Sequence, residues 1–194
     1  MTEHIVSIGK VKLRPKLLED AWDDYTWRVD SELATLDAAT PLRQSFEQFL
    51  RYYKEELRSP SPWSQRYSIT TLDEKHIGNC MSYDINISFG EAELGIMIGD
   101  RNYWNQSFGY DSMVALVDHM FTSTSLRRLY LHTLEWNKRA RKCFEKCGFT
   151  LRRVEDRSNK SFALMDIFRD QWYQVRDEKL PQADSVAPSL PTSG

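Results

Sequence analysis

The stretch that decides the fold is Glu93-Leu-Gly-Ile-Met-Ile-Gly-Asp-Arg-Asn-Tyr-Trp-Asn-Gln-Ser-Phe-Gly109. From Glu93 to Gly99 it is apolar apart from the glutamate, which is typical of a buried strand. A short polar loop follows, and a helix opens near Ser107. Free N–H groups and the dipole of a helix start attract anions, and small residues let the backbone approach a phosphate closely. The pattern therefore indicates either a phosphate site or an ordinary helix start that binds nothing.

A second informative stretch is Leu129-Tyr-Leu-His-Thr-Leu-Glu-Trp-Asn137, followed by the basic segment Lys138-Arg-Ala-Arg-Lys-Cys-Phe-Glu-Lys-Cys-Gly-Phe149. We expect a strand over 128–134 and then a helix that Asn137 caps and Gly148 ends. The basic face of this helix is a candidate binding surface, with simple solvation as the alternative.

The remaining pattern alternates between strand and helix periods, with Thr40-Pro41 as the expected start of the second helix. We expect strands over 10–14, 66–72, 77–85, 92–99, 128–134, 149–154 and 161–168, and helices over 18–25, 41–57, 110–121 and 137–147. A mixed sheet with helices packed on it buries the apolar faces of such an arrangement.

Composition narrows the class of protein. The 194 residues carry a formal net charge of −2, which gives no global electrostatic case for binding nucleic acid or a membrane surface. Three cysteines and an N-terminus without a signal-peptide pattern favour the reducing cytoplasm. We expect one domain over 1–178 and a flexible Pro/Ser/Ala-rich tail over 179–194.

Taken together, the two informative stretches resemble the GNAT superfamily of N-acetyltransferases. The cofactor loop of that family reads Arg/Gln-x-x-Gly-x-Gly/Ala, and here the same register is Trp104-Asn-Gln-Ser-Phe-Gly109. Its later motif reads Asn-x-x-Ala-x-x-x-Tyr-x-x-x-Gly-Phe, and the matching residues here are Asn137, Ala140, Phe144, Gly148 and Phe149. The N-terminal segment Val11-Lys-Leu-Arg-Pro15 and the residues after it look like the RimJ/RimL-type subgroup, which acetylates ribosomal-protein N-termini.

The resemblance implies a fold, a cofactor and a set of contacts. The fold is an α/β (α+β) GNAT fold, with a mixed, largely antiparallel sheet of about seven strands and helices on both faces. Acetyl-CoA is the expected acyl donor, and no metal is expected. The implied cofactor-binding residues are Ile96, Met97, Ile98, Asn105, Gln106, Ser107, Phe108, Gly109, Tyr110, Asn137, Ala140 and Phe144.

Acetyl transfer to an amine needs a base, and Glu93 is the candidate because it is the only ionisable residue in its apolar strand. The alternative is a strand-end carboxylate that faces solvent or pairs with an arginine. Phe144 stands where the family usually has the tyrosine that protonates the leaving thiolate. Cys143, Tyr110 or water is the candidate replacement.

The acceptor is expected to be a small amine or a protein N-terminus, bound near the first two helices. Trp27 and Trp63 are the candidate aromatic contacts, and Asp30 is the candidate anionic contact for a cationic amine. The expected partners are this acceptor alone, with no nucleic acid and no membrane, and the chain is expected to be a monomer or homodimer. The rival hypothesis is a GNAT-like module that binds CoA or a protein without turnover.

Overall fold

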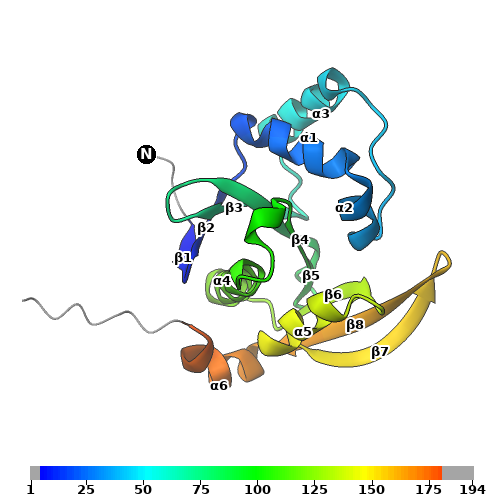
Figure 1. Ribbon diagram of the computed structural model, residues 1–194. Helices are drawn as coiled ribbons and strands as arrows, with labels where there is room; N and C mark the ends of the chain where they lie inside the picture. Colours follow the sequence, from blue (N-terminus) through cyan, green and yellow to red (C-terminus); the bar gives the residue numbers. More distant parts are fainter. Residues whose placement is uncertain (1–4, 181–194) are drawn as a thin grey trace, which may run out of the picture.

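The computed structural model describes residues 5–180, which form one mixed sheet with helices on both of its faces (Figure 1). The sheet has eight strands where the sequence predicts about seven, and the predicted α/β class is confirmed. The tail predicted over 179–194 lies outside the described residues from position 181 onward. None of the helices within residues 5–180 is both long enough and apolar enough to cross a membrane.

The elements alternate along the chain much as the periodicity predicts. The strands are β1 (Val6–Ile8), β2 (Val11–Pro15), β3 (Gln65–Thr71), β4 (His76–Asn86), β5 (Glu91–Ile98), β6 (Arg128–Leu134), β7 (Thr150–Arg157) and β8 (Lys160–Phe168). The helices are η1 (Leu18–Asp20), α1 (Ala21–Val29), α2 (Ser31–Leu36), α3 (Phe46–Arg58), η2 (Arg101–Tyr103), α4 (Phe108–Ser123), α5 (Lys138–Lys146) and α6 (Arg169–Lys179).

Three of these elements have no clear signal in the sequence. The strand β1 has three residues and the helix α2 has six, which is too short for either period to stand out. The helix α6 is mostly polar and is held by one fully buried side chain, Trp172, whose indole N–H donates to Asp118 at 3.1 Å. All three elements depend on what they pack against more than on their own pattern.

The prediction that α3 starts at Thr40-Pro41 is wrong. The helix begins at Phe46, and Ser45 is its N-cap. The Ser45 hydroxyl accepts from the Gln48 N–H at 3.3 Å, and the Gln48 side chain accepts from the Ser45 N–H at 3.1 Å. This reciprocal capping box satisfies two helix-end donors, which a first-turn proline alone does not do.

The strand order is β1-β2-β3-β4-β5-β6-β8-β7, and every neighbouring pair is antiparallel except β5 with β6. That parallel pair is joined only over Glu91–Glu93 and Arg128–Tyr130. Beyond Glu93 and Tyr130 the two strands diverge, while β5 stays paired to β4 and β6 stays paired to β8. The sheet is therefore split along the C-terminal halves of β5 and β6.

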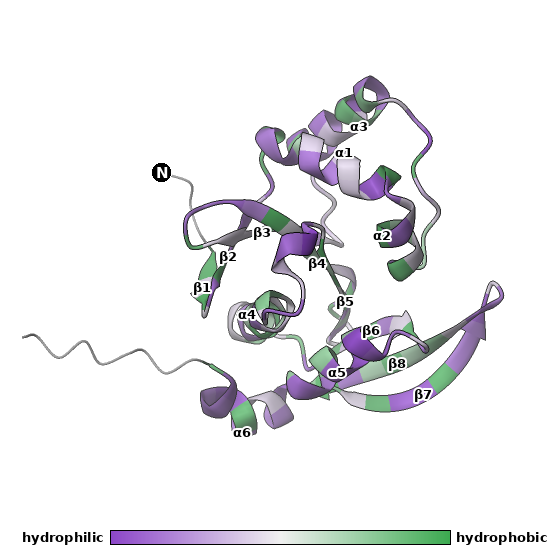
Figure 2. Ribbon diagram, in the orientation of Figure 1, coloured by the Kyte–Doolittle hydropathy of each residue, from purple (hydrophilic) through white to green (hydrophobic). Residues whose placement is uncertain are grey.

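The helix α4 fills the core on one face of the sheet, and α1, α2 and α3 cover the other face (Figure 1). The predicted amphipathic helix over 110–121 is buried along most of its length. Side chains with no exposed surface are Met113, Val114, Ala115, Leu116, Val117, Met120 and Phe121. Each large apolar side chain buried in this way contributes roughly 1.5–3 kcal/mol. In Figure 2, by contrast, α1 is predominantly hydrophilic.

Candidate active site

A cavity of about 920 Å³ occupies the split between β5 and β6. This volume lies within the range of small-molecule sites in proteins, about 300–1,000 Å³. Residues of α2, β4, β5, β6, α4, α5, β7, β8, η2 and the loop before α4 line it. Because it lies where the sheet is open, the cavity reaches both faces.

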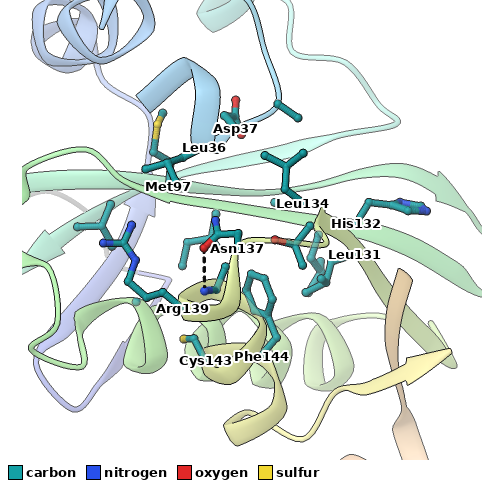
Figure 3. A pocket seen from close by; sticks show the side chains of 18 of the residues that line it. Leu36, Asp37, Met97, Leu131, His132, Leu134, Asn137, Arg139, Cys143 and Phe144 are labelled. Atoms are coloured by element: carbon teal, nitrogen blue, oxygen red, sulfur yellow. Dashed lines mark hydrogen bonds between the residues drawn. The ribbon is translucent and has the colours of Figure 1, made fainter. Parts of the chain in front are cut away.

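Side-chain alternation divides the cavity into two halves. Glu93 and Met97 on β5 project to the face covered by α2, together with His132 and Leu134 on β6. The intervening residues project to the opposite face, which α4 and α5 cover. Figure 3 shows Leu36, Asp37 and Met97 on one side of the cavity, with Cys143 and Phe144 on the other.

Glu93 lies at the point where β5 and β6 separate, and it is 8% exposed. Its Oε1 is 2.7 Å from Nδ1 of His132. On the other side, Tyr83 is its cross-strand partner on β4. Burial and the Glu93 carboxylate together raise the pKa of the Tyr83 phenol, so this group keeps its proton at neutral pH. A carboxylate thus faces the centre of the cavity and is held between two polar side chains.

The half of the cavity beneath α2 is mainly apolar and carries one further acid. Leu33 and Leu36 supply apolar surface from α2, and Asp37 follows directly at the rim. Asp37 is half-exposed at the rim; the protein atoms around it raise its pKa, while Arg28 at 3.9 Å opposes that shift. Gly95 lies between Glu93 and Met97 on the same face and lines the cavity without a side chain.

In the other half, β5 presents an unpaired backbone edge. The Gly99 N–H donates to Ile77 O on the β4 side at 2.9 Å. Backbone groups of successive strand residues alternate between the two edges, so those of Ile98 and Ile96 face the split. The indole N–H of Trp104 donates a hydrogen bond to the Ile98 carbonyl at 2.7 Å. The Ile96 groups and the Ile98 N–H are left for a ligand.

The loop between β5 and α4 has two non-glycine residues in the left-handed region. Asn105 has a φ of 58° and Ser107 has a φ of 69°. Ser107 is the N-cap position of α4, and its side chain makes no capping hydrogen bond. It stands where the family motif has glycine, and the chain adopts the glycine conformation there despite the side chain. The first N–H groups of α4 therefore face the cavity beside Ser107, Gly109 and Tyr110.

This strain predicts the effect of replacing Ser107 with glycine. A left-handed residue with a Cβ costs roughly 1–2 kcal/mol, and the extra freedom of glycine in the unfolded chain returns part of it. We expect Ser107→Gly to raise the free energy of unfolding by about 0.5–1 kcal/mol, measured by urea titration. Ser107→Ala keeps the Cβ and is the control that should give no gain. An equal gain in both variants would contradict the argument from strain.

Trp104 stands where the family motif has Arg or Gln, and two cations stack on its ring. The guanidinium of Arg139 lies 4.1 Å from the ring centroid and that of Arg101 lies 5.5 Å from it. Arg139, Lys142 and Lys146 line the cavity from α5. The basic face of this helix is therefore turned, at these positions, toward the site.

The predicted cap of α5 is confirmed, because the Asn137 side chain accepts from the Ala140 N–H at 3.2 Å (Figure 3). Asn137, Ala140 and Phe144 all line the cavity. Phe144 is 7% exposed and packs edge-on against Phe149. It has no proton to donate, whereas the nearby Tyr110 and Cys143 do.

Two predicted cofactor residues do not line the cavity. The Gln106 side chain turns back to donate to Asn102 O, and the main-chain carbonyl of Gln106 accepts from the Lys10 ammonium at 3.1 Å. Phe108 packs edge-on against Tyr103, with ring centroids 4.9 Å apart. The other ten predicted cofactor residues lie on the cavity wall: Ile96, Met97, Ile98, Asn105, Ser107, Gly109, Tyr110, Asn137, Ala140 and Phe144.

The three predicted acceptor contacts lie away from the cavity wall. Trp27 covers the backbone of Gly99, where an added Cβ would meet its ring at 2.0 Å. Trp63 is 61% exposed, in the loop before β3. Asp30 caps α2 and forms an ion pair with Arg101 at 2.8 Å. These side chains have structural partners or face solvent. Of the helices on that face of the sheet, α2 is the one that lines the cavity, through Leu33 and Leu36.

His132 is the functional candidate that the sequence does not reveal. The segment over 129–134 places His132 opposite the buried Leu129 and Leu131, which is an ordinary strand pattern. Its importance comes from Glu93, 39 residues earlier in the chain. Only the parallel pairing of β5 and β6 brings the two side chains to the same face.

Comparisons with known proteins agree with this arrangement. The family model described as the acetyltransferase (GNAT) domain matches residues 10–150. An uncharacterized N-acetyltransferase, p20 of Bacillus licheniformis, is 34% identical over 67 residues, which are 34% of this chain and 37% of that protein. The aligned part thus spans little more than a third of the relative.

Solved structures share the fold over nearly their whole length. Spermidine N-acetyltransferase from Vibrio cholerae, in complex with CoA and spermine, superposes with a TM-score of 0.76 at 20% identity, over 84% of this chain and 98% of that one. The aminoglycoside acetyltransferase AAC(6')-Ib with coenzyme A gives 0.72 at 19% identity, over 86% and 99%. With a family match over residues 10–150, the chain belongs to the GNAT acetyltransferase family.

Proposed function

We propose that this protein transfers an acetyl group from acetyl-CoA to a primary amine, with Glu93 as the general base. The observation that carries the proposal is the two-sided cavity, with a buried carboxylate where its halves meet. A donor and an acceptor entering from opposite faces of the sheet would meet beside Glu93. Spermidine acetyltransferase and aminoglycoside acetyltransferase, which share the fold, were both solved with CoA.

The residues of the α5 side suit acetyl-CoA. The unpaired edge at Ile96 and Ile98 fits the amide-containing pantetheine arm, and the first N–H groups of α4 beside Ser107 and Gly109 fit a diphosphate. Arg139 and Lys142 supply positive charge beside that loop. When bound, acetyl-CoA supplies a thioester whose carbonyl carbon is open to attack by an amine.

The chain then has three tasks in the reaction. Glu93 accepts a proton from the ammonium form of the amine, which frees the nitrogen to attack the thioester carbon. The second proton, which nitrogen loses as the C–N bond forms, replaces the one that goes to the thiolate. A backbone N–H on the unpaired edge of β5, at Ile96 or Ile98, would donate to the oxygen that gains charge. As the C–S bond breaks, Tyr110, Cys143 or water supplies a proton to the thiolate. Interaction with the Cys147 thiol, together with the charges of Lys146 and Arg139, lowers the pKa of Cys143.

The acceptor half favours a small cationic amine. It is lined by Leu33 and Leu36, and it carries acidic groups at Asp37 and Glu93. Resemblance to the RimJ/RimL-type subgroup adds a protein N-terminus as the second candidate. Both acceptors present a primary amine.

The test is calorimetric titration with acetyl-CoA and CoA, followed by thiol release with spermidine, an aminoglycoside and a peptide with a free N-terminus. Micromolar binding together with amine-dependent release supports the proposal. Binding without release from any of these amines supports the rival binding module. No binding of either CoA form would overturn the assigned cofactor site.

Arg139 gives a prediction about the cofactor alone. Because its guanidinium is held on Trp104 beside the α4 loop, we expect Arg139→Ala to weaken acetyl-CoA binding about tenfold, or roughly 1.4 kcal/mol. The effect should shrink at high salt, since a charge–charge interaction is screened. Lys138→Ala removes the same charge from the exposed side of α5, and calorimetry should show little change. Equal losses in the two variants would point to a diffuse effect of charge.

A further inference from the structure

The imidazole of His132 connects Glu93 to the surface. Its Nδ1 lies 2.7 Å from Glu93 Oε1, and its Nε2 lies 3.1 Å from Glu155 Oε1. The side chain of Glu93 is 11% exposed and that of Glu155 is 19% exposed. The hydrogen-bonded path from Glu93 to Glu155 therefore passes through the His132 ring, which contacts one carboxylate with each of its nitrogens.

Both neutral forms of this ring have a complete set of partners. With the proton on Nδ1, the ring donates to the Glu93 carboxylate, and Nε2 accepts from the Arg157 guanidinium at 3.0 Å. With the proton on Nε2, the ring donates to Glu155, and Nδ1 accepts from a protonated Glu93. Arg157 then no longer donates to Nε2 and keeps its ion pair with Glu155. A histidine that serves only as a brace needs one of these arrangements. This site provides for two, at little cost in unsatisfied hydrogen bonds.

The reaction itself creates the need for such a connection. A primary amine reaches the site as an ammonium ion, and acetylation gives a neutral amide, a thiol and one free proton. That proton cannot stay on Glu93, because the carboxylate must be restored before the next turnover. Glu93 is buried, and during turnover the substrates would cover it from the cavity side.

We propose that His132 and Glu155 form a proton exit relay from Glu93 to solvent. Protonated Glu93 gives its proton to Nδ1 of His132, the ring releases the proton on Nε2 to Glu155, and Glu155 passes it to water. Arg157 and Arg153, both bonded to Glu155, hold that carboxylate in place. His132 acts through Glu93 and is a positioning and relay residue, with Tyr130 packed edge-on against its ring. The relay rests on the proposed function.

The variant that separates relay from bracing is His132→Asn. An asparagine amide keeps a donor near the place of Nδ1, so it preserves the contact with Glu93 but offers no second nitrogen for Glu155. With acetyl-CoA and spermidine, or the fastest amine of the panel, we expect kcat to fall about 10- to 100-fold, within the range of proton-transfer catalysis. The KM for acetyl-CoA should not change. Glu155→Gln should lower kcat by a smaller factor.

Rescue by a diffusible base is the decisive readout. Raising imidazole at constant ionic strength should restore much of the lost rate of His132→Asn and leave the wild type unaffected. His119→Asn is the matched control, because His119 lies on α4 against Tyr67, away from the cavity, and should keep the wild-type rate. Urea titration and CoA calorimetry establish that each variant is folded and binds the cofactor.

The possible outcomes are distinct. Rate loss in His132→Asn with rescue by imidazole supports the relay. An unchanged rate, or a loss that imidazole does not restore in a folded variant, overturns it and leaves the acetyltransferase proposal standing. If the wild type releases thiol with none of the amines, the proposed function fails and the relay falls with it.

Discussion

Replacing Glu93 with glutamine is expected to lower kcat for amine acetylation roughly 10²- to 10⁴-fold, the usual contribution of a positioned base. The substitution keeps the size of the side chain and a hydrogen-bonding partner for His132, and it removes the group that accepts the proton. Acetyl-CoA binding should be unchanged within a factor of two, since Glu93 lies at the edge of the cofactor half of the cavity. Thiol release and calorimetry on the same preparation measure the two effects.

Glu91→Gln is the matched control for this experiment. Glu91 begins the same strand, but its carboxylate pairs with Arg128 at 2.7 Å and does not line the cavity. We expect an activity close to that of the wild type. If Glu93→Gln also retains the full rate, Glu93 has no part in proton transfer and the proposed mechanism is wrong. If it loses both rate and CoA binding, the residue is structural.

The second large effect is expected in stability, at Asp20. This carboxylate is 1% exposed and accepts from both terminal nitrogens of Arg14, at 2.6 and 2.7 Å. It also accepts from the Ser68 hydroxyl at 2.6 Å and from the Leu17 N–H at 2.8 Å. These bonds connect η1, at the base of α1, to β2 and β3. Asp20 therefore fixes the helices that cover one face of the sheet.

Asp20→Asn is expected to lower the free energy of unfolding by roughly 3–5 kcal/mol, the usual cost of leaving a buried charge without its partner. The uncompensated group is Arg14, which is 3% exposed. Urea denaturation measures the loss. Glu19→Gln, an exposed neighbour, is the control and should change stability by less than about 0.5 kcal/mol. A loss below about 1 kcal/mol in Asp20→Asn would contradict the account of this pair.

The same residue predicts part of the acid sensitivity. Burial alone would raise the pKa of Asp20, but the Arg14 guanidinium, His76 and Ser68 outweigh it and hold the pKa well below its ordinary value. Since the folded-state pKa is the lower one, the stabilisation is complete above the unfolded pKa of about 3.9 and is lost as the pH falls below it. Stability of Asp20→Asn should therefore depend less on pH between about 5 and 2 than that of the wild type.

Much of the fold follows from local patterns in the sequence. The strand over 128–134 matches its predicted bounds, and α5 begins after the predicted cap at Asn137. Strand and helix periods and helix caps depend on residues within a few positions of one another. The family motifs are local in the same way, and ten of the twelve predicted cofactor residues lie on the cavity wall.

The wrong start of α3 has a local cause, the capping box at Ser45, whereas the omissions involve long-range packing. The acceptor contacts predicted at Trp27 and Trp63 rested on residue type, and their positions relative to the cavity depend on how α1 and the loop before β3 pack. The short helix α2, which supplies Leu36 and Asp37 to the cavity, has no periodic signal of its own. The spacing of an aromatic residue in the sequence does not predict whether its side chain faces a ligand or a neighbouring backbone.

The sequence by itself thus determined the fold class and the order of most elements, because these depend on local periodicity and contiguous motifs. Ten of the cofactor-binding residues that the family resemblance implies also lie on the cavity wall. Only the tertiary structure decided that β5 and β6 part after Glu93 and Tyr130, which opens the cavity through the sheet. It also decided that Glu93 meets His132. The physical reason is that the packing of the whole core sets the pairing register between distant strands, so no short segment of the chain predicts that register.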